Sequence, residues 1–272
     1  MEDLNGIERQ YPFPLERVDF QEIDFRYAMK VADEIRQRFN LGDRPAVVLE
    51  KTLEDRFGVK VWYEELEEGS AAATVGSFGP AILMNSKQSP WRRNYNFAHE
   101  VFHLITWNSV PAETIRKDNV GWERIEKVAN VFASCLLLPG DRVTVEFENR
   151  VSDGKITFSD LIEVARTFDV STEALLYRLL NLKLLADETV QTLLADDDFR
   201  ALDRSTMATR WWTPPKFPER FVILAFRAYQ KGRLSKAKFA ALLDTSLFDL
   251  SDLLQEYGLD DRGSYNAEFP AS

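Results

Sequence analysis

The two histidines of this chain lie four residues apart, and a glutamate directly follows the first of them. They are His99 and His103 in the segment NYNFAHEVFHLITW, with Glu100 between them, and the 272 residues contain no other histidine. Residues four apart lie on one face of an α-helix, so both imidazoles can bind one metal ion. Glu100 can then reach a water molecule at the open position of that metal. We therefore predict a helix over 97–106 that carries two zinc ligands and a general base.

A catalytic zinc site needs a third protein ligand, which cannot be a histidine here. Cys135 lies in the apolar run FASCLLL, which favours a buried structural thiol. Glu126 is the better candidate, because Asn130 follows it by one helical turn and can help to orient a carboxylate ligand. Glu123, three residues earlier on the same predicted helix, competes with it. The residues alone leave this choice open.

Apolar periodicity predicts the elements around these residues. Amphipathic helices are expected over 25–39 and 47–57, and VKVWYEEL alternates as a half-buried strand does. AAATVGSFGPAILMN reads as two short strands joined by a turn, and WERIEKVANVFASCLLL as a helix that stops at PGD. The segment from 159 to 185 reads as two helices that break at Asp169, the second capped by Ser171.

The paired segments RRNYNFAHEVFHLITW and IEKVANVFASCLLLP resemble the ImmA/IrrE family of bacterial metallopeptidases. That family has an Ala-His-Glu-x-x-His-Leu helix followed by a Glu-x-x-Ala-Asn-x-Phe-Ala helix that ends in Leu-Leu-x-Pro. The likeness extends upstream to LGDRPAVVLEKTLEDRFGVKVWYEEL and downstream to VARTFDVSTEALLYRLLNL, so it covers roughly residues 25 to 185. The pair of motifs is much more specific than the histidine motif alone.

This resemblance implies an α+β fold of the reduced thermolysin-like zincin type, with a small sheet packed on the active-site helices. It implies one zinc ion held by His99, His103 and Glu126, with Glu100 as general base. Glu126 is selected over Glu123 because the family's ligand stands four residues before the asparagine that matches Asn130. Phe102 departs from the family, which usually has glycine there, and we expect it to pack while changing the shape of the neighbouring pocket.

Further residues are candidates for contact with a substrate. In zincins a strand edge beside the active-site helix aligns the substrate as an added strand, and Ile82 to Asn85 is the candidate segment here. Arg93, with Arg92, precedes the active-site helix and could contact a substrate or lie in a solvated turn. Tyr95 could stabilise an oxyanion.

Composition shifts set the expected domain boundaries, with the strongest signal at RWWTPPKFPERF. The region after it is all helical, with a cap at Ser235, a turn near Asp244 and an end at Gly258. We expect an N-terminal extension (1–24), a zincin-like metallopeptidase core (25–145), a helical subdomain that completes the catalytic unit (146–204), a linker (205–218), a helical C-terminal module (219–262) and a tail (263–272).

Charge and cysteine content exclude several classes of protein. The net charge of −10 disfavours a large non-specific surface for nucleic acid or anionic membrane, and the last predicted helix is acidic where a DNA-reading helix would be basic. We therefore expect no direct DNA binding. One cysteine, an acidic N-terminus without a secretion signal, and the lack of an apolar run long enough for a bilayer favour a cytoplasmic protein with no membrane association.

The family resemblance implies a function in regulation by proteolysis. We expect a protein substrate such as a helix-turn-helix repressor or an antitoxin, cleaved in stress response or in the control of a mobile element. The alternative is a non-proteolytic, metal-containing regulator or toxin–antitoxin component that acts by binding other proteins. The presence of Glu100 argues against this alternative, because a site that only holds metal does not need that carboxylate.

Overall fold

The computed structural model describes residues 1–7, 13–14, 18–110, 119–208 and 211–260. The chain divides into two units, one made of Tyr11–Pro214 and the other of Met1–Gln10 together with Pro215–Ser272. The predicted core (25–145) and helical subdomain (146–204) thus lie in one unit. The start of the predicted N-terminal extension instead joins the C-terminal helices. The predicted tail lies outside the described residues.

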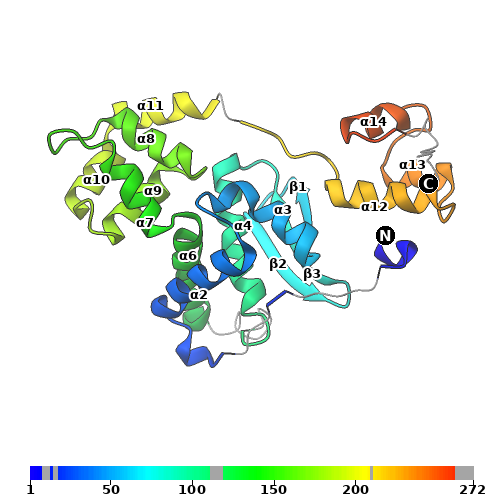
Figure 1. Cartoon of the computed structure of the whole chain (residues 1–272), viewed down its shortest axis with the longest axis horizontal. Coiled ribbons are helices and arrows are strands. Elements are labelled where there is room, and N and C mark those ends of the chain that lie inside the picture. The colour runs from blue at the N-terminus through cyan, green and yellow to red at the C-terminus, as the bar shows by residue number, and fades with distance from the viewer. Residues whose placement is uncertain (8–12, 15–17, 111–118, 209–210, 261–272) are drawn as a thin grey trace, which may run out of the picture. The chain divides into compact units, whose positions relative to one another are not determined.

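The larger unit combines a small sheet with many helices, which confirms the predicted α+β class (Figure 1). Its elements are η1 (Phe20–Glu22), α2 (Phe25–Phe39), α3 (Pro45–Phe57), β1 (Lys60–Glu64), β2 (Ala71–Gly76), β3 (Gly79–Asn85), α4 (Pro90–Ile105), α6 (Asn119–Leu137), α7 (Gly140–Glu148), α8 (Phe158–Thr167), α9 (Thr172–Asn181), α10 (Asp187–Ala195) and α11 (Asp197–Ala208). A proline at the first helical position starts both α3 and α4, where its missing N–H has no helical partner to lose.

The sheet has the strand order β1-β3-β2, with β1 parallel and β2 antiparallel to β3. The prediction that Ile82 to Asn85 forms a substrate-binding edge is therefore wrong, because β3 is the central strand and is paired on both sides. The Asn85 side chain instead donates to the carbonyl oxygens of Leu66 and Gly69, at 3.1 and 3.0 Å, and holds the loop before β2. The edge that borders α4 is β2.

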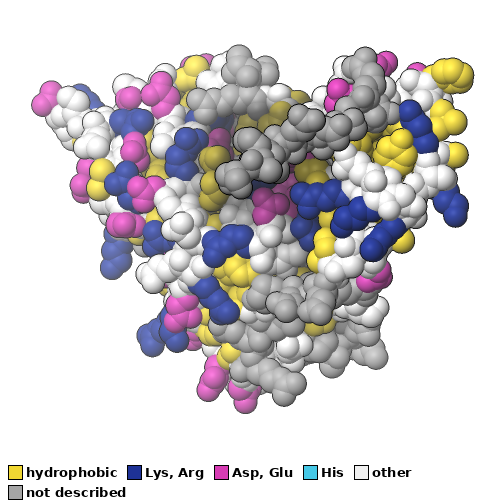
Figure 2. Space-filling model, turned by 45° about the vertical axis from the view of Figure 1, so that its right-hand side comes forward, with side chains coloured by type: hydrophobic (Ala, Val, Ile, Leu, Met, Phe, Trp, Pro, Cys, Tyr) yellow, Lys and Arg dark blue, Asp and Glu magenta, His cyan; other side chains and the backbone are white. Residues whose placement is uncertain are grey.

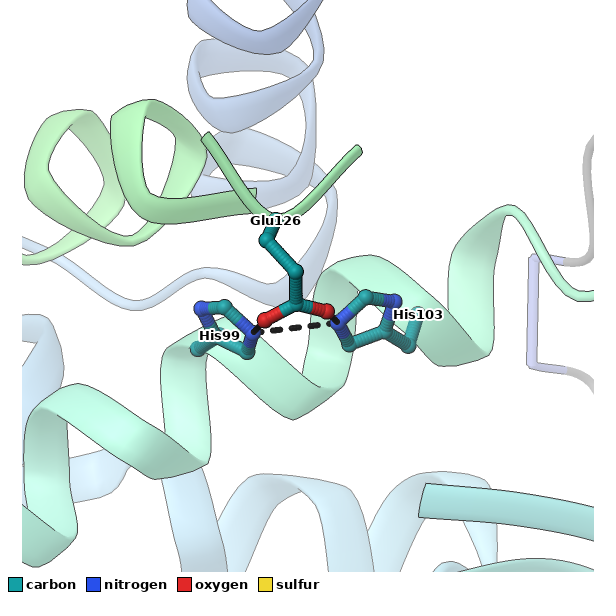
Figure 3. Close-up of side chains that lie close together, drawn as sticks. All are labelled: His99, His103 and Glu126. Carbon is teal, nitrogen blue, oxygen red and sulfur yellow. Dashed lines mark hydrogen bonds and ion pairs between the residues drawn. The ribbon is translucent and has the colours of Figure 1, made fainter. Parts of the chain in front are cut away.

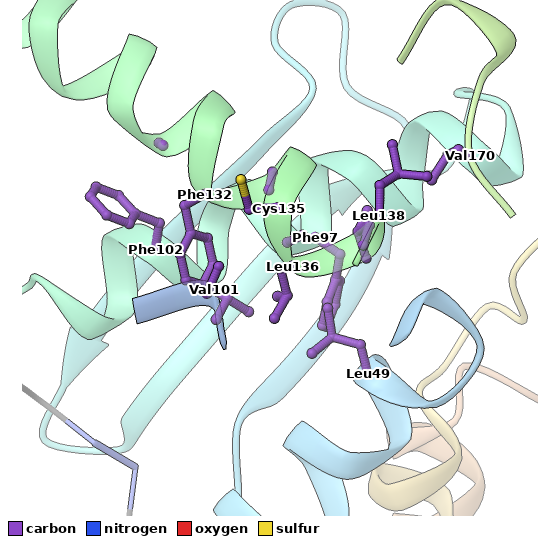
Figure 4. Close-up of a cluster of buried hydrophobic side chains, with 14 of the residues drawn as sticks. Leu49, Phe97, Val101, Phe102, Phe132, Cys135, Leu136, Leu138 and Val170 are labelled. Atoms are coloured by element: carbon purple, nitrogen blue, oxygen red, sulfur yellow. The ribbon is translucent and has the colours of Figure 1, made fainter. Parts of the chain in front are cut away.

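Helix α4 lies between the sheet and α6, and its apolar face forms the centre of the core (Figure 4). Phe97, Val101 and Phe102 are almost fully buried there. The Phe102 ring lies 5.4 Å from the ring of Phe132 on α6, measured between centroids, and 6.5 Å from Tyr27 on α2. As expected, Phe102 packs, and the burial of this face fixes which residues of α4 point the other way.

The helices after α6 follow the predicted pattern in part. The break between α8 and α9 lies at Asp169, which has a left-handed backbone with φ of 53°. The cap at Ser171 is confirmed, since its hydroxyl accepts from the Ala174 N–H. Helix α11 continues to Ala208, so the first part of the predicted linker is helical.

The smaller unit contains α1 (Glu2–Asn5), α12 (Glu219–Gln230), α13 (Lys236–Leu242) and α14 (Leu250–Glu256). The cap at Ser235 is confirmed by a hydrogen bond from the Lys238 N–H. The Asn5 side chain donates to the carbonyl oxygen of Leu224 at 2.8 Å, and Glu2 pairs with Arg220 at 3.0 Å. These contacts attach the first helix of the chain to α12, and the sequence offered no signal for them.

Acidic, basic and hydrophobic side chains are all present on the face of the molecule drawn in Figure 2. Within the described residues no single helix has both the length and the apolarity to cross a membrane; Val120–Leu137 and Gly140–Glu148, bent by 58°, satisfy those criteria only as a pair.

Candidate metal centre

Three side chains from two helices meet at one point (Figure 3). His99 and His103 project from the face of α4 opposite the core, and Glu126 reaches them from α6. The Nε2 atoms of the two histidines are 3.0 Å apart, and the Glu126 carboxylate oxygens lie 3.3 Å from His99 Nε2 and 3.2 Å from His103 Nε2. Helical spacing thus presents both imidazoles side by side, as predicted.

These separations fit one metal ion. Two ligand atoms about 2.1 Å from a tetrahedral centre are about 3.4 Å apart. The three observed separations of 3.0 to 3.3 Å are close to this value. Two imidazoles and one carboxylate are also the donor set of many catalytic zinc sites, which leave a fourth position for water. His99, His103 and Glu126 could therefore hold a divalent metal with one position open.

Asn130 orients the first histidine. Its side-chain oxygen lies 3.0 Å from His99 Nδ1, and an amide oxygen can only accept, so Nδ1 carries a proton and Nε2 is the ring atom left for a metal. Asn130 thus contacts a histidine rather than Glu126, the side chain that the sequence suggested it would orient. Such a hydrogen bond behind a ligand fixes the ring and its tautomer.

Tyr95 does not have the role that was suggested for it. Its hydroxyl donates to the backbone carbonyl of Asn130 at 2.8 Å, and burial raises its pKa to about 12. This bond links α4 to α6 one helical turn before His99. The hydroxyl is thus engaged in holding the two helices together rather than directed as an oxyanion donor.

Glu100 is buried beside the three ligands, with 8% of its surface exposed. Burial raises the pKa of its carboxyl group, against the opposing charges of His103 and His99 and a hydrogen bond from the backbone of Ala73. Glu100 therefore lies between the ligand cluster and the edge strand β2. A carboxyl group buried beside a metal site is positioned to accept a proton from water bound there.

The charges within the cluster stabilise one another. Burial alone would lower the pKa of His99, but the hydrogen bond to Glu126 and the charges of Glu100 and Glu126 outweigh it, so that the pKa lies above its ordinary value. Burial would raise the pKa of Glu126, yet its hydrogen bonds to His103 and His99 lower it to about 2. Glu126 is thus ionised at every physiological pH, as a metal ligand must be.

The two competing ligands lie elsewhere. Glu123 is exposed on α6 and outside the cluster. Cys135 is buried, and the guanidinium of Arg178 donates to its sulfur at 3.2 Å. The structure therefore brings only Glu126 to the histidines among the candidates that the sequence left open.

Arg93, a candidate for substrate contact from the sequence, is buried and bonded to backbone carbonyl groups. Only 2% of it is exposed, and its guanidinium donates to the carbonyl oxygens of Ser86, Gln88 and Trp212. The same group lies 4.3 Å from the centre of the Trp212 ring. Arg93 thus ties the start of α4 to the loop before it and to the segment after α11, whereas its neighbour Arg92 is exposed.

A cleft of about 100 Å³ opens over the cluster. Besides the ligands and Glu100 it is lined by Ala71, Ala72 and Ala73 of β2 and by Trp107, Val110 and Trp122. Sequence reasoning missed all six. Trp107 follows His103 by four residues, which is a signal that could have placed it on the same face as the histidines.

Comparisons with known proteins give one match to a family model and one to a solved structure. Residues 54–180 match the family model Peptidase_M78, described as the IrrE N-terminal-like domain. Among solved structures, a Mycobacterium tuberculosis transcriptional regulator matches with a TM-score of 0.42 and 18% identity, over 59% of this chain and 51% of that chain. The chain thus spans about half the length of that structure. The comparison with curated proteins finds no match.

Proposed function

We propose that this chain is a zinc-dependent endopeptidase that cleaves a regulatory protein, because residues 54–180 match the model of the Peptidase_M78 family, the IrrE N-terminal-like domain. The observation that carries the proposal is the position of Glu100, buried between the His99, His103 and Glu126 cluster and the edge of β2. A site that only held metal would not need a buried carboxylate there. The substrate we propose is a helix-turn-helix repressor or an antitoxin.

Each residue of the site has one part in the proposed reaction. His99, His103 and Glu126 would hold the zinc ion, which when bound polarises a carbonyl group and lowers the pKa of water. Glu100 takes the proton from the attacking water and passes it to the leaving amine. Its raised pKa supports the first transfer, because a carboxylate whose conjugate acid has a higher pKa is a stronger base.

Strand β2 provides the place for the substrate backbone. Backbone groups of successive residues point to opposite sides of an antiparallel ladder. Since the Ala73 N–H bonds to Glu100, the backbone groups of Ala71, Ala73 and Val75 face away from β3. A substrate segment added along this edge would bring its carbonyl groups past Glu100. This requires an extended segment, which favours a flexible linker or an exposed strand in the substrate.

The test is cleavage of candidate repressors or antitoxins by the zinc-loaded protein, followed by mass spectrometry. Glu100→Gln should keep one bound metal ion and lose cleavage by at least about a hundredfold, the lower end of the range expected for loss of a general base. Glu123→Gln is the matched control, because Glu123 is an exposed glutamate on α6 outside the cluster. This variant should cleave normally.

A different result would support the binding-platform alternative. If Glu100→Gln retains the biological effect of the wild-type protein in cells, the proposed proteolysis is not the function. If the candidate proteins stay intact after incubation with fully zinc-loaded wild type, that result would count against the proposed substrate class.

A further inference from the structure

We propose that Trp107, Val110 and Trp122 form the wall of a subsite that selects a large apolar side chain next to the scissile bond. The inference rests on the proposed peptidase function, whereas the geometry of the cleft does not depend on that function. The lining of the cleft combines the histidines and glutamates of the cluster with these three large apolar residues. A peptide that lay across Glu100 would place a neighbouring side chain beside them.

Trp122 stands directly against a metal-ligand candidate. Its ring is parallel to the ring of His103, with centroids 5.7 Å apart and an interplanar angle of 11°. Trp122 is half-buried in the first turn of α6, so one face of the indole covers the histidine and the rest of the ring lines the cleft. The apolar surface therefore begins at the cluster itself, within reach of a residue adjacent to the cleaved bond.

The turn after α4 holds the other part of the wall in place. The N–H groups of Trp107 and Val110 donate to the carbonyl oxygens of Leu104 and Thr106, at 3.3 and 2.9 Å. Thr106, only 1% exposed, bonds through its hydroxyl to the carbonyl of Phe102 at 2.9 Å. These bonds continue the course of the helix beyond its last residue. The wall is thus formed before any ligand binds, which limits the entropy lost on binding.

Small residues of β2 also line the cleft. Ala71, Ala72 and Ala73 leave space beside β2 that larger side chains would fill. The cleft volume of about 100 Å³ is of the same order as the apolar cavities of about 150 Å³ that hold benzene. With both tryptophans and alanines in its lining, the subsite suits Leu, Met or Phe better than a polar or a very small side chain.

Two peptides test the inference without any knowledge of the natural substrate. They are acetyl-Gly-Gly-Leu-Leu-Gly-Gly-amide and the same peptide with Ser-Ser at its centre. In the first measurement the metal-free full-length protein is titrated with each peptide, and the indole N–H resonances of Trp107 and Trp122 are followed by NMR. We expect the Leu-Leu peptide to shift both resonances and the Ser-Ser peptide to shift neither.

In the second measurement the zinc-loaded protein cleaves both peptides, with Glu100→Gln as background. We expect kcat/KM to favour the Leu-Leu peptide by at least about tenfold, the discrimination typical of an apolar pocket. Trp107→Ala should reduce this ratio towards one. Trp211→Ala is the matched control, because Trp211 is a half-exposed tryptophan of the same unit whose ring contacts Trp91 and not the cleft.

The outcomes separate this inference from the proposed function. If the indole resonances respond equally to both peptides, or if Trp107→Ala keeps the wild-type preference, the subsite is refuted. If neither peptide is cleaved but the Leu-Leu peptide shifts the indoles selectively, the subsite stands and the peptidase proposal fails. Trp122→Leu, checked for unchanged metal content, gives a second variant in case Trp107→Ala does not fold.

Discussion

Arg93 should be among the most important residues for the stability of α4, although it lies outside the cleft. The replacement to make is Arg93→Met, which keeps a long side chain and removes the guanidinium. In the wild type this group makes hydrogen bonds of 3.1, 2.6 and 2.7 Å to the carbonyl oxygens of Ser86, Gln88 and Trp212. It also stacks on the Trp212 ring at 4.3 Å.

The expected magnitude follows from these contacts. Each hydrogen bond to a charged group contributes about 1.5–3 kcal/mol, and the stacking adds about 1 kcal/mol. Burial of the guanidinium opposes them, and it lowers the pKa of Arg93 against the charges of Tyr63 and Glu50. Removal of one partner from such a buried polar network typically costs about 3–5 kcal/mol, because the carbonyl groups remain without donors. We expect a loss in this range.

Hydrogen exchange of backbone amides can measure this loss of stability in α4 itself. Because the chain has two units, a single global unfolding curve would mix their transitions. A loss of 3 kcal/mol corresponds to exchange more than about a hundredfold faster for amides of α4. Arg92→Met is the matched control, since Arg92 is adjacent but exposed, and it should change exchange by less than about threefold. Equal exchange rates in the two variants would refute the reasoning and would make a substrate contact for Arg93 plausible again.

Three further predictions concern the site and its support. Asn130→Ala should weaken metal binding by about 10- to 100-fold in a chelator competition, because His99 Nδ1 loses its acceptor; an unchanged affinity would contradict that role. Phe102→Ala should destabilise α4 by about 3–5 kcal/mol, measured by hydrogen exchange of its amides, and leave the metal stoichiometry at one, whereas a loss of metal alone would place Phe102 in the site. Glu50→Gln should stabilise the protein at neutral pH, because burial raises the pKa of the Glu50 carboxyl above its unfolded value despite the hydrogen bond from Tyr63. The stability contributed by a raised carboxyl pKa is present below about pH 4.3, the unfolded value, and is lost as the pH rises through the folded pKa. In thermal melts the variant should therefore be more stable than wild type only above about pH 4.3. An equal gain in stability at pH 3 would contradict the prediction.

The cluster of metal-ligand candidates could be predicted because it depends on local spacing. His99 and His103 share a helical face whatever the tertiary arrangement. Glu126 was selected by the family resemblance, because it stands four residues before Asn130. The core face of α4 was also readable, since its apolar residues recur with helical period. The helix itself begins earlier than predicted, at Pro90, because polar residues around Arg93 suggested a turn.

The sheet order could not be read in the same way. The short loop of two residues between β2 and β3 predicts that these strands pair, and they do. Whether β1 then joins the β3 side or the β2 side depends on packing against α3 and α4, and nothing in the three short segments encodes it. The parallel pairing of β1 with β3 puts β3 in the centre and makes β2 an edge, so the prediction that Ile82 to Asn85 forms an edge was wrong.

The contact between Arg93 and Trp212 joins residues 119 positions apart and sets an order of events during synthesis. His99, His103 and Glu126 leave the ribosome early, long before Trp212 does. At roughly 5–20 residues per second, the interval between Arg93 and Trp212 is roughly 6–24 s. During this time the nascent chain already carries all three candidate ligands, while Arg93 at the start of α4 still lacks one of its three acceptors and the indole on which it stacks. The candidate ligands are therefore complete before the contact that fixes the start of α4 can form.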